Sequence, residues 1–174
     1  MDHGPGPYAE FEAFVAGAAG RLLRVAILLT AEPSTPAADT GTEAAAGAPA
    51  ARGLLGGALA RTYADWRRLR GDDPYDHTRQ ELCAAFARTG RRHHGGTGVL
   101  GPLSPLERLV VVLRLYEGVA EEVTAAQLGL APERVRALCD RAVSELRSRP
   151  GASSGAAPGA TSGTSPDAHR KEAA

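Results

Sequence analysis

The sequence is poor in several residue types, and each shortage narrows the class of protein. Lys171 is the only lysine among 20 basic residues, so almost every positive charge is an arginine. Twenty acidic residues balance them, so the chain is not a polycation and any nucleic-acid surface must be local. Abundant arginine, alanine and glycine together are typical of a GC-rich genome. Part of the arginine content therefore carries no functional information.

Cysteine and long apolar runs are also scarce. Cys83 and Cys139 have no metal-ligand spacing and sit among apolar helical positions, which predicts reduced, buried thiols. We expect no segment that approaches the roughly 20 apolar residues needed to span a bilayer. The opening residues MDHGPGPYAEF lack a basic stretch followed by an apolar one, so we predict no signal peptide. These observations indicate a cytoplasmic protein without a membrane partner.

Apolar residues recur at helical spacing in several segments, and no strand pattern is present. The first segment carries the stripe Phe11, Phe14, Val15, Ala18, Leu22, Val25, Ala26 and Leu29. We predict helices over 11–30, 54–69, 75–88, 104–118, 120–128 and 132–147. Gly56 and Gly57 each cost about 1 kcal/mol relative to alanine, which predicts a weak first turn in the second helix. Ser104 and Pro105 are a typical helix start.

The segments between these helices differ in composition. Residues 31–51 are small and proline-rich, and we predict a flexible insert there. Glycine is frequent in a short linker over 93–102, which follows the basic pair Arg91 and Arg92, and residues 150–174 are expected to form a disordered tail. The sequence thus predicts an all-α protein with two small helical domains, 8–92 and 103–149, joined by this linker.

The stretch LGLAPERVRALCDRAVSELR (128–147) predicts the second half of a helix-turn-helix. Gly129 can adopt the left-handed conformation that such a turn needs, and Pro132 and Glu133 suit the first turn of the next helix. Its apolar stripe is Val135, Leu138, Cys139, Ala142, Val143 and Leu146, and Arg134, Arg136 and Arg141 lie away from it. Such a helix either reads DNA or is simply the last core helix of a small domain.

The order of segments resembles a known family. LSPLERLVVVLRLYEGVAEEVTAAQLGLAPERVRALCDRAVSELR (103–147) resembles region four of bacterial sigma factors of the extracytoplasmic-function (ECF) type. Residues 11–30 and 58–82 resemble parts of region two, particularly in actinobacterial members. The resemblance implies that region four binds double-stranded promoter DNA and that region two grips core RNA polymerase. It also implies DNA contacts by Pro132, Glu133, Arg134, Arg136 and Arg141, and an anti-sigma factor as a further partner.

Region two departs from the family pattern. Arg52, Gly53 and Gly57 stand where acidic or polar residues usually form the polymerase-binding helix start, and Ala84 stands where asparagine is common. We therefore expect a degenerate region two and name no polymerase-binding residues. Three hypotheses remain: an ECF-like sigma factor that binds core polymerase, a sigma-derived DNA-binding regulator without initiation activity, and a decoy that holds a protein partner.

Residues that suggest catalysis or metal binding have simpler explanations. His93 and His94 are adjacent and so do not share a helix face, and Asp72, Asp73 and Asp76 suit a solvated turn and a helix cap. Tyr63 and Trp66 are interpreted as core residues rather than as a platform for stacked bases. We predict no catalytic residue, no metal site and no cofactor.

Overall fold

The computed structural model describes residues 6–33, 47–69 and 71–148, and the regular structure in these ranges is entirely helical. The α-helices are α1 (Pro7–Thr30), α2 (Pro49–Asp65), α3 (Pro74–Thr89), α4 (Pro105–Val111), α5 (Glu121–Leu128) and α6 (Pro132–Arg147). A 3-10 turn, η1 (Gly90–His93), follows α3, and a π-helical turn, η2 (Val112–Tyr116), continues α4. The all-α prediction is confirmed. The insert centre, 34–46, and the tail from 149 lie outside the described residues.

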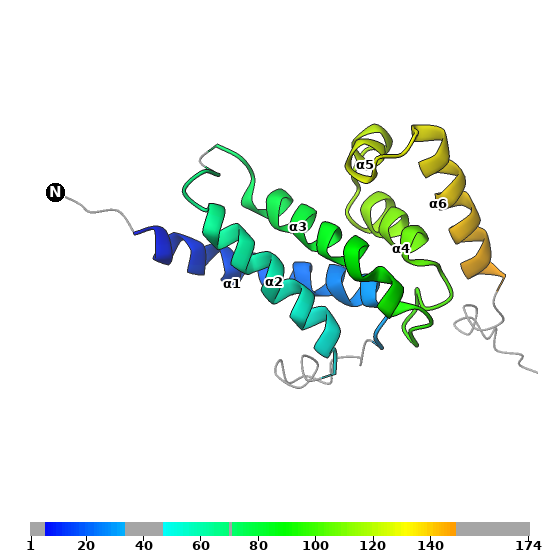
Figure 1. Ribbon diagram of the computed structural model, residues 1–174, viewed down its shortest axis with the longest axis horizontal. Coiled ribbons are helices and arrows are strands. Elements are labelled where there is room, and N and C mark those ends of the chain that lie inside the picture. The colour runs from blue at the N-terminus through cyan, green and yellow to red at the C-terminus, as the bar shows by residue number, and fades with distance from the viewer. Residues whose placement is uncertain (1–5, 34–46, 70, 149–174) are drawn as a thin grey trace, which may run out of the picture.

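The helices form two neighbouring groups (Figure 1). Helices α1, α2 and α3 pack side by side, and α6 packs across α4 and α5 at the other end of the molecule. Helix α4 contacts α1 and α3 as well as α6, so it connects the two groups. The expected division into domains 8–92 and 103–149 stays a prediction.

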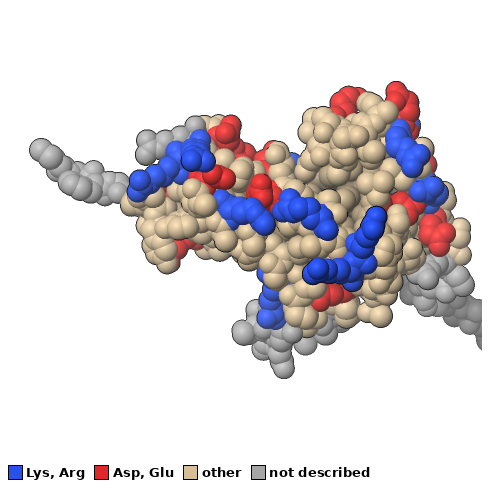
Figure 2. Space-filling view, viewed as in Figure 1, with Lys and Arg blue, Asp and Glu red and all other residues tan. Residues whose placement is uncertain are grey.

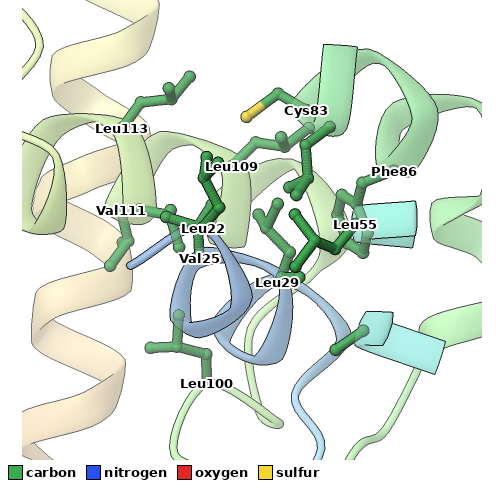
Figure 3. Packing of buried hydrophobic residues seen from close by; sticks show 14 of the residues in the cluster. Leu22, Val25, Leu29, Leu55, Cys83, Phe86, Leu100, Leu109, Val111 and Leu113 are labelled. Carbon is green, nitrogen blue, oxygen red and sulfur yellow. The ribbon is translucent and has the colours of Figure 1, made fainter. Parts of the chain in front are cut away.

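One apolar core extends through both groups. Leu22, Val25 and Leu29 of α1 have no exposed surface, and they pack with Phe86 of α3 and Leu109 of α4 (Figure 3). The second half of the α1 stripe is buried as expected, whereas Phe11, Phe14 and Val15 are only partly covered. Burial of apolar surface is the main favourable contribution to folding, so this shared core couples the two groups energetically.

Helix α1 overturns one expectation. By length and composition it is the one helix in the described ranges that could cross a membrane, so the statement that no segment approaches this is wrong. A third of its most apolar window is buried inside the protein. The core helix of a soluble protein passes the same test, and the packing of Leu22, Val25 and Leu29 fits that explanation.

Helix α2 begins five residues earlier than the periodicity indicated, inside the segment interpreted as an insert. The carboxylate of Glu32 accepts hydrogen bonds from the backbone N–H groups of Ala50 (3.1 Å) and Ala51 (2.8 Å), which lie in the first turn of α2. Ala51 is fully buried. A carboxylate satisfies the unpaired N–H groups of a helix start and complements its dipole. The predicted weak turn at Gly56 therefore lies in the middle of a helix whose start is capped from a distance.

The segment interpreted as a linker, 93–102, is packed tightly against the end of α1. The N–H of Gly98 donates to the carbonyl of Ala31 at 2.7 Å, and Leu100 is 5% exposed. A Cβ atom on Gly96 would lie 2.3 Å from the carbonyl oxygen of Ala31, and one on Gly101 would lie 1.8 Å from that of Gly96. Glycine is required here because backbone meets backbone directly, which composition alone does not reveal.

Arg108 of α4 holds this junction together. It is fully buried, and its guanidinium donates to the carbonyl oxygens of Leu100 (3.0 Å), Gly101 (2.9 Å), Leu29 (3.3 Å) and His93 (2.6 Å). The carbonyl of Leu29 is one of those left unpaired at the end of α1, where the helix dipole favours a positive charge. One side chain thus joins the C-terminal helices to α1, to η1 and to the glycine-rich segment.

Tyr63 and Trp66 do not lie in the core, where the sequence analysis placed them. Tyr63 is 48% exposed, and Trp66 is only partly buried. Both belong to a surface cluster on α1 and α2, in which the ring of Phe11 lies 4.9 Å from that of Tyr63 and 5.1 Å from that of Trp66. Both residues lie on the helix face that the spacing predicts, but this face is exposed at the end of the α1–α2 pair where Phe11 lies.

Candidate nucleic-acid interface

Helices α5 and α6 form the helix-turn-helix. Gly129 ends α5 with a φ of +65°, as the sequence predicted. The N–H of Leu130 donates to the carbonyl of Ala125 at 2.9 Å, and the N–H of Gly129 donates to that of Ala126 at 3.3 Å. This pair of bonds is the Schellman ending, which requires a left-handed residue at the position of Gly129. The turn therefore fixes the angle between the two helices.

The inner face of α6 holds the helix on the rest of the protein. Val135 and Ala142 are fully buried and Leu138 is 3% exposed, while Cys139, Val143 and Leu146 are partly buried. Val135 and Leu138 pack with Val110 of α4 and Ala125 of α5 in a small cluster. The apolar stripe predicted for this helix is confirmed, and it leaves the opposite face in solvent.

The five residues expected to meet DNA lie on or beside this outer face. Glu133, Arg134, Arg136 and Arg141 are exposed, and Pro132 is partly buried at the first position of α6. Ala131 caps the helix without a side-chain hydrogen bond. The N-terminal residues of a recognition helix are those that reach base edges in the major groove. Arg134 lies in this turn, and it has no ion-pair partner among the residues that the structure describes.

The other two arginines are paired within the protein. Arg136 donates to both carboxylate oxygens of Glu121, at 2.6 and 3.2 Å, and Arg141 donates to Glu107 at 2.7 Å. Both arginine side chains are still 65% exposed. The carboxylate partners are only 13% exposed, so each pair offers its guanidinium end to solvent, where a DNA phosphate can reach it. No local sequence signal predicts the pair with Glu121, which is 15 residues away from Arg136.

Glu107 has a second contact, at the start of α4. Its carboxylate accepts from the backbone N–H and the hydroxyl of Ser104, while its own N–H donates back to that hydroxyl. Burial opposes ionisation of this carboxyl group, but the bonds from Ser104 and the Arg141 guanidinium outweigh burial and lower its pKa. The spacing S-x-x-E is the signal of such a capping box, of which only the serine was recognised in the sequence.

A further basic surface lies on the N-terminal helices. Figure 2 shows arginine side chains, in blue, running across the face formed by α2 and α3. The exposed arginines between residues 47 and 93 are Arg52, Arg61, Arg67, Arg68, Arg88, Arg91 and Arg92. Arg61 and Arg68 are paired with Glu81 and Asp65. No acidic residue occurs between Glu81 and Glu107, so Arg88, Arg91 and Arg92 form a local positive cluster.

The residues that suggested other chemistry have structural roles. Asp73 caps α3 by accepting from the N–H of Tyr75 at 2.8 Å, as expected. The ring of His93 stacks on that of Phe86, with centroids 5.6 Å apart. Burial raises the pKa of the Cys83 thiol to about 12, so this thiol is protonated at neutral pH. In the ranges that the structure describes, no group of three or more His, Cys, Asp or Glu side chains could hold a metal ion.

Comparison with known proteins agrees with this geometry. No curated protein and no solved structure matches the chain. Residues 99–148 match the family model for sigma-70 region 4, and this range contains α4, η2, α5 and α6. In sigma factors this domain is the helix-turn-helix that binds promoter DNA, and it also contacts RNA polymerase. The C-terminal helices therefore match a DNA-binding domain of the sigma-70 region 4 type, which supports a sigma-factor-type protein.

Proposed function

We propose that this protein is a transcription initiation factor of the ECF sigma type, acting in the cytoplasm through promoter DNA and core RNA polymerase. The observation that carries the proposal is that a family match and a fold coincide in the same residues. The residues that match region 4 are those that fold into a helix-turn-helix with a buried inner face and an exposed arginine-bearing outer face. The chemistry at the interface is binding, and no catalytic step is required.

The proposed DNA contact is made by the N-terminal half of α6. Arg134 is the first candidate for base or phosphate contact because its guanidinium has no carboxylate partner in the described ranges. Arg136 and Arg141 would turn from Glu121 and Glu107 toward phosphates. Pro132 and Glu133 directly precede Arg134 in the same turn. Phosphate contacts set the position of the helix, and the side chains nearest its start supply specificity.

The proposed polymerase contact lacks assigned residues. Helix α2 is continuous through the part that departs from the family pattern, which supports a folded region-two-like unit. Arg52, Gly53 and Gly57 are exposed on this helix, so its surface differs in charge from the acidic start of typical members. A polymerase contact here would use different side chains.

The proposal is tested by mixing the purified chain with core RNA polymerase and a genomic promoter library. Co-elution with polymerase together with transcripts that start at defined sites would support it. Sequence-specific DNA binding without co-elution would instead indicate a sigma-derived regulator. Binding to neither DNA nor polymerase would contradict both readings and favour a decoy for a protein partner, including an anti-sigma factor.

A further inference from the structure

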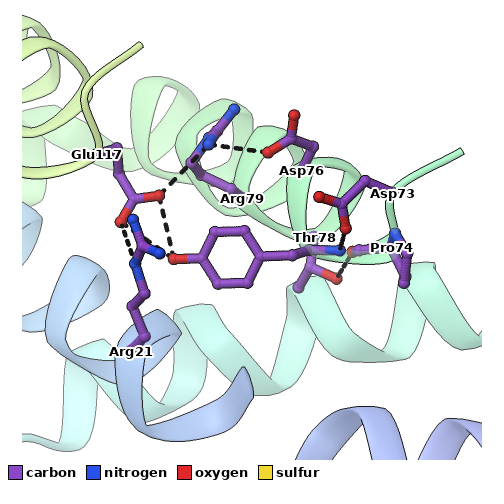
Figure 4. A network of polar contacts seen from close by, with 8 residues as sticks. Arg21, Asp73, Pro74, Asp76, Thr78, Arg79 and Glu117 are labelled. Carbon is purple, nitrogen blue, oxygen red and sulfur yellow. Dashed lines mark hydrogen bonds and ion pairs between the residues drawn. The ribbon is translucent and has the colours of Figure 1, made fainter. Parts of the chain in front are cut away.

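Glu117 is a buried carboxylate that comes from the C-terminal helices but is held by the N-terminal ones. Its side chain has no exposed surface. It accepts from the Nε of Arg21 on α1 at 3.1 Å, from the hydroxyl of Tyr75 on α3 at 3.0 Å, and from Arg79 on α3 at 3.4 Å (Figure 4). Its donors thus lie 96, 42 and 38 residues away in the sequence, and none belongs to the region 4 match.

Local backbone geometry aims Glu117 at these donors. The π-helical turn η2 precedes it, and the N–H of Glu117 closes that turn on the carbonyl of Val112 at 2.9 Å. Gly118 then has a φ of +69°, which reverses the chain directly after the carboxylate. Single π-helical turns are rare and often mark functional positions. Here the turn moves the end of the helix so that Glu117 faces α1 and α3.

The charges in this network balance. Two guanidinium groups, Arg21 and Arg79, meet two carboxylates, because Arg79 also pairs with Asp76 at 2.9 Å. Arg21 lies over the ring of Tyr75, with 5.0 Å between its Cζ atom and the ring centroid. Removing one member of a buried, paired group leaves an uncompensated charge. Loss of Glu117 would leave Arg79, with its side chain 9% exposed, without its partner from the C-terminal helices.

We infer that Glu117 is a latch that fixes the position of the helix-turn-helix relative to α1 and α3, so that the two groups of helices move as one body. Arg108 and the shared core join the same two groups, but they depend on backbone carbonyls and on non-directional apolar contacts. Glu117 supplies the directional contact between side chains of the two groups. The inference concerns the free protein and holds whichever DNA or partner the chain binds.

The test measures distances in full-length protein that carries Cys83→Ala and Cys139→Ala. One pair of spin labels, on Ala60→Cys of α2 and Ser144→Cys of α6, spans the two groups. A second pair, on Val123→Cys of α5 and Ser144→Cys, lies within the helix-turn-helix. All three label sites are exposed. We expect Glu117→Gln to broaden the distance distribution of the spanning pair about twofold and to leave the inner pair unchanged, because only the relative position is released.

Glu121→Gln is the matched control. Its side chain also pairs with an arginine, but both partners belong to the helix-turn-helix, so neither distribution should change. If Glu117→Gln does not fold, Arg21→Ala and Tyr75→Phe decide, because each removes one donor from the network and Arg21 is half exposed. A spanning distribution that stays narrow in these variants would overturn the latch, as would equal broadening of both pairs.

Discussion

The individual arginines of α6 differ in what surrounds them. Arg134 has no carboxylate partner in the described ranges, whereas Arg136 must leave Glu121 before it can meet a phosphate. We expect Arg134→Ala to weaken DNA binding by about 1–3 kcal/mol, and Arg136→Ala to weaken it less. Fluorescence anisotropy with a duplex selected from a random library measures both. Arg147→Ala, at the far end of the same helix, is the control. Equal affinities for Arg134→Ala and Arg147→Ala would contradict the assignment.

The surroundings of His93 predict that folding stability depends on pH. Burial is the main cause that lowers the pKa of this imidazole, and Arg108 and Arg92 lower it further against the opposing effect of Glu32. The unfolded chain therefore binds the proton more tightly, and stability falls as the pH drops below about 6.5. Above that value the contribution of the neutral ring is complete.

Urea unfolding between neutral and mildly acidic pH checks this expectation. His93→Phe keeps an aromatic ring against Phe86 and should flatten the dependence on pH around 6. His94→Gln is the neighbouring control, since His94 is exposed, and it should behave like the natural protein. The same slope in His93→Phe and in the natural protein would refute the argument.

At the scale of elements, glycines with the same sequence appearance have opposite roles. Gly56 lies inside α2, where an added Cβ would meet nothing within 4 Å, so Gly56→Ala should stabilise the protein by about 1 kcal/mol. Gly101 lies in the segment against α1, where a Cβ would be 1.8 Å from the carbonyl oxygen of Gly96. Gly101→Ala should destabilise by about 1–3 kcal/mol. Urea midpoints of the two variants should shift in opposite directions. Shifts of the same sign would contradict the close packing of Gly101 or the open space around Gly56.

These glycines illustrate what the sequence could and could not predict. Helical periodicity identified the buried faces of α1 and α6 because that signal is local. The caps at Ser104, Asp73 and Gly129 are also encoded within a few residues. The start of α2 was missed because its cap, Glu32, lies 18 residues before Ala50, whose N–H donates to the Glu32 carboxylate. The segment 93–102 was interpreted as a linker because composition alone does not distinguish glycines that permit close packing from glycines that permit flexibility.

The candidate interface divides in the same way. Exposure of Arg134, Arg136 and Arg141 follows from the apolar stripe and was predictable. The pairing of Arg136 with Glu121 was not, because it depends on the angle that Gly129 sets between α5 and α6. In the sequence, Glu117 is distinguished only by its place in the region-four pattern. Its role needs the positions of α1 and α3, which no local signal carries.

At the scale of the whole molecule, the shared core predicts cooperative unfolding. The single tryptophan, Trp66, follows α2 and reports on the N-terminal helices, while circular dichroism reports on all of them. We expect both signals to show the same urea midpoint, as in a two-state transition. Arg108→Met should lower both midpoints together and reduce the free energy of unfolding by about 3 kcal/mol or more, because four carbonyls, three of them in buried bonds, lose a charged donor.

The control is Arg24→Met, which removes an exposed arginine from α1 and should leave the midpoints nearly unchanged. Two separate transitions in the natural protein would mean that the groups of helices unfold independently. Separation that appears only in Arg108→Met would show that this one side chain maintains the coupling.

The buried network around Glu117 also bears on the order in which the chain is made. Protein synthesis delivers Arg21, Tyr75 and Arg79 well before Glu117. While the chain is still growing, α1 and α3 can pack on each other, but the donors aimed at the missing carboxylate must stay hydrated, which keeps that side of the pair open to water. The N-terminal helices leave the ribosome first, but their packing is complete only after the helix-turn-helix has been made and Glu117 has reached its donors.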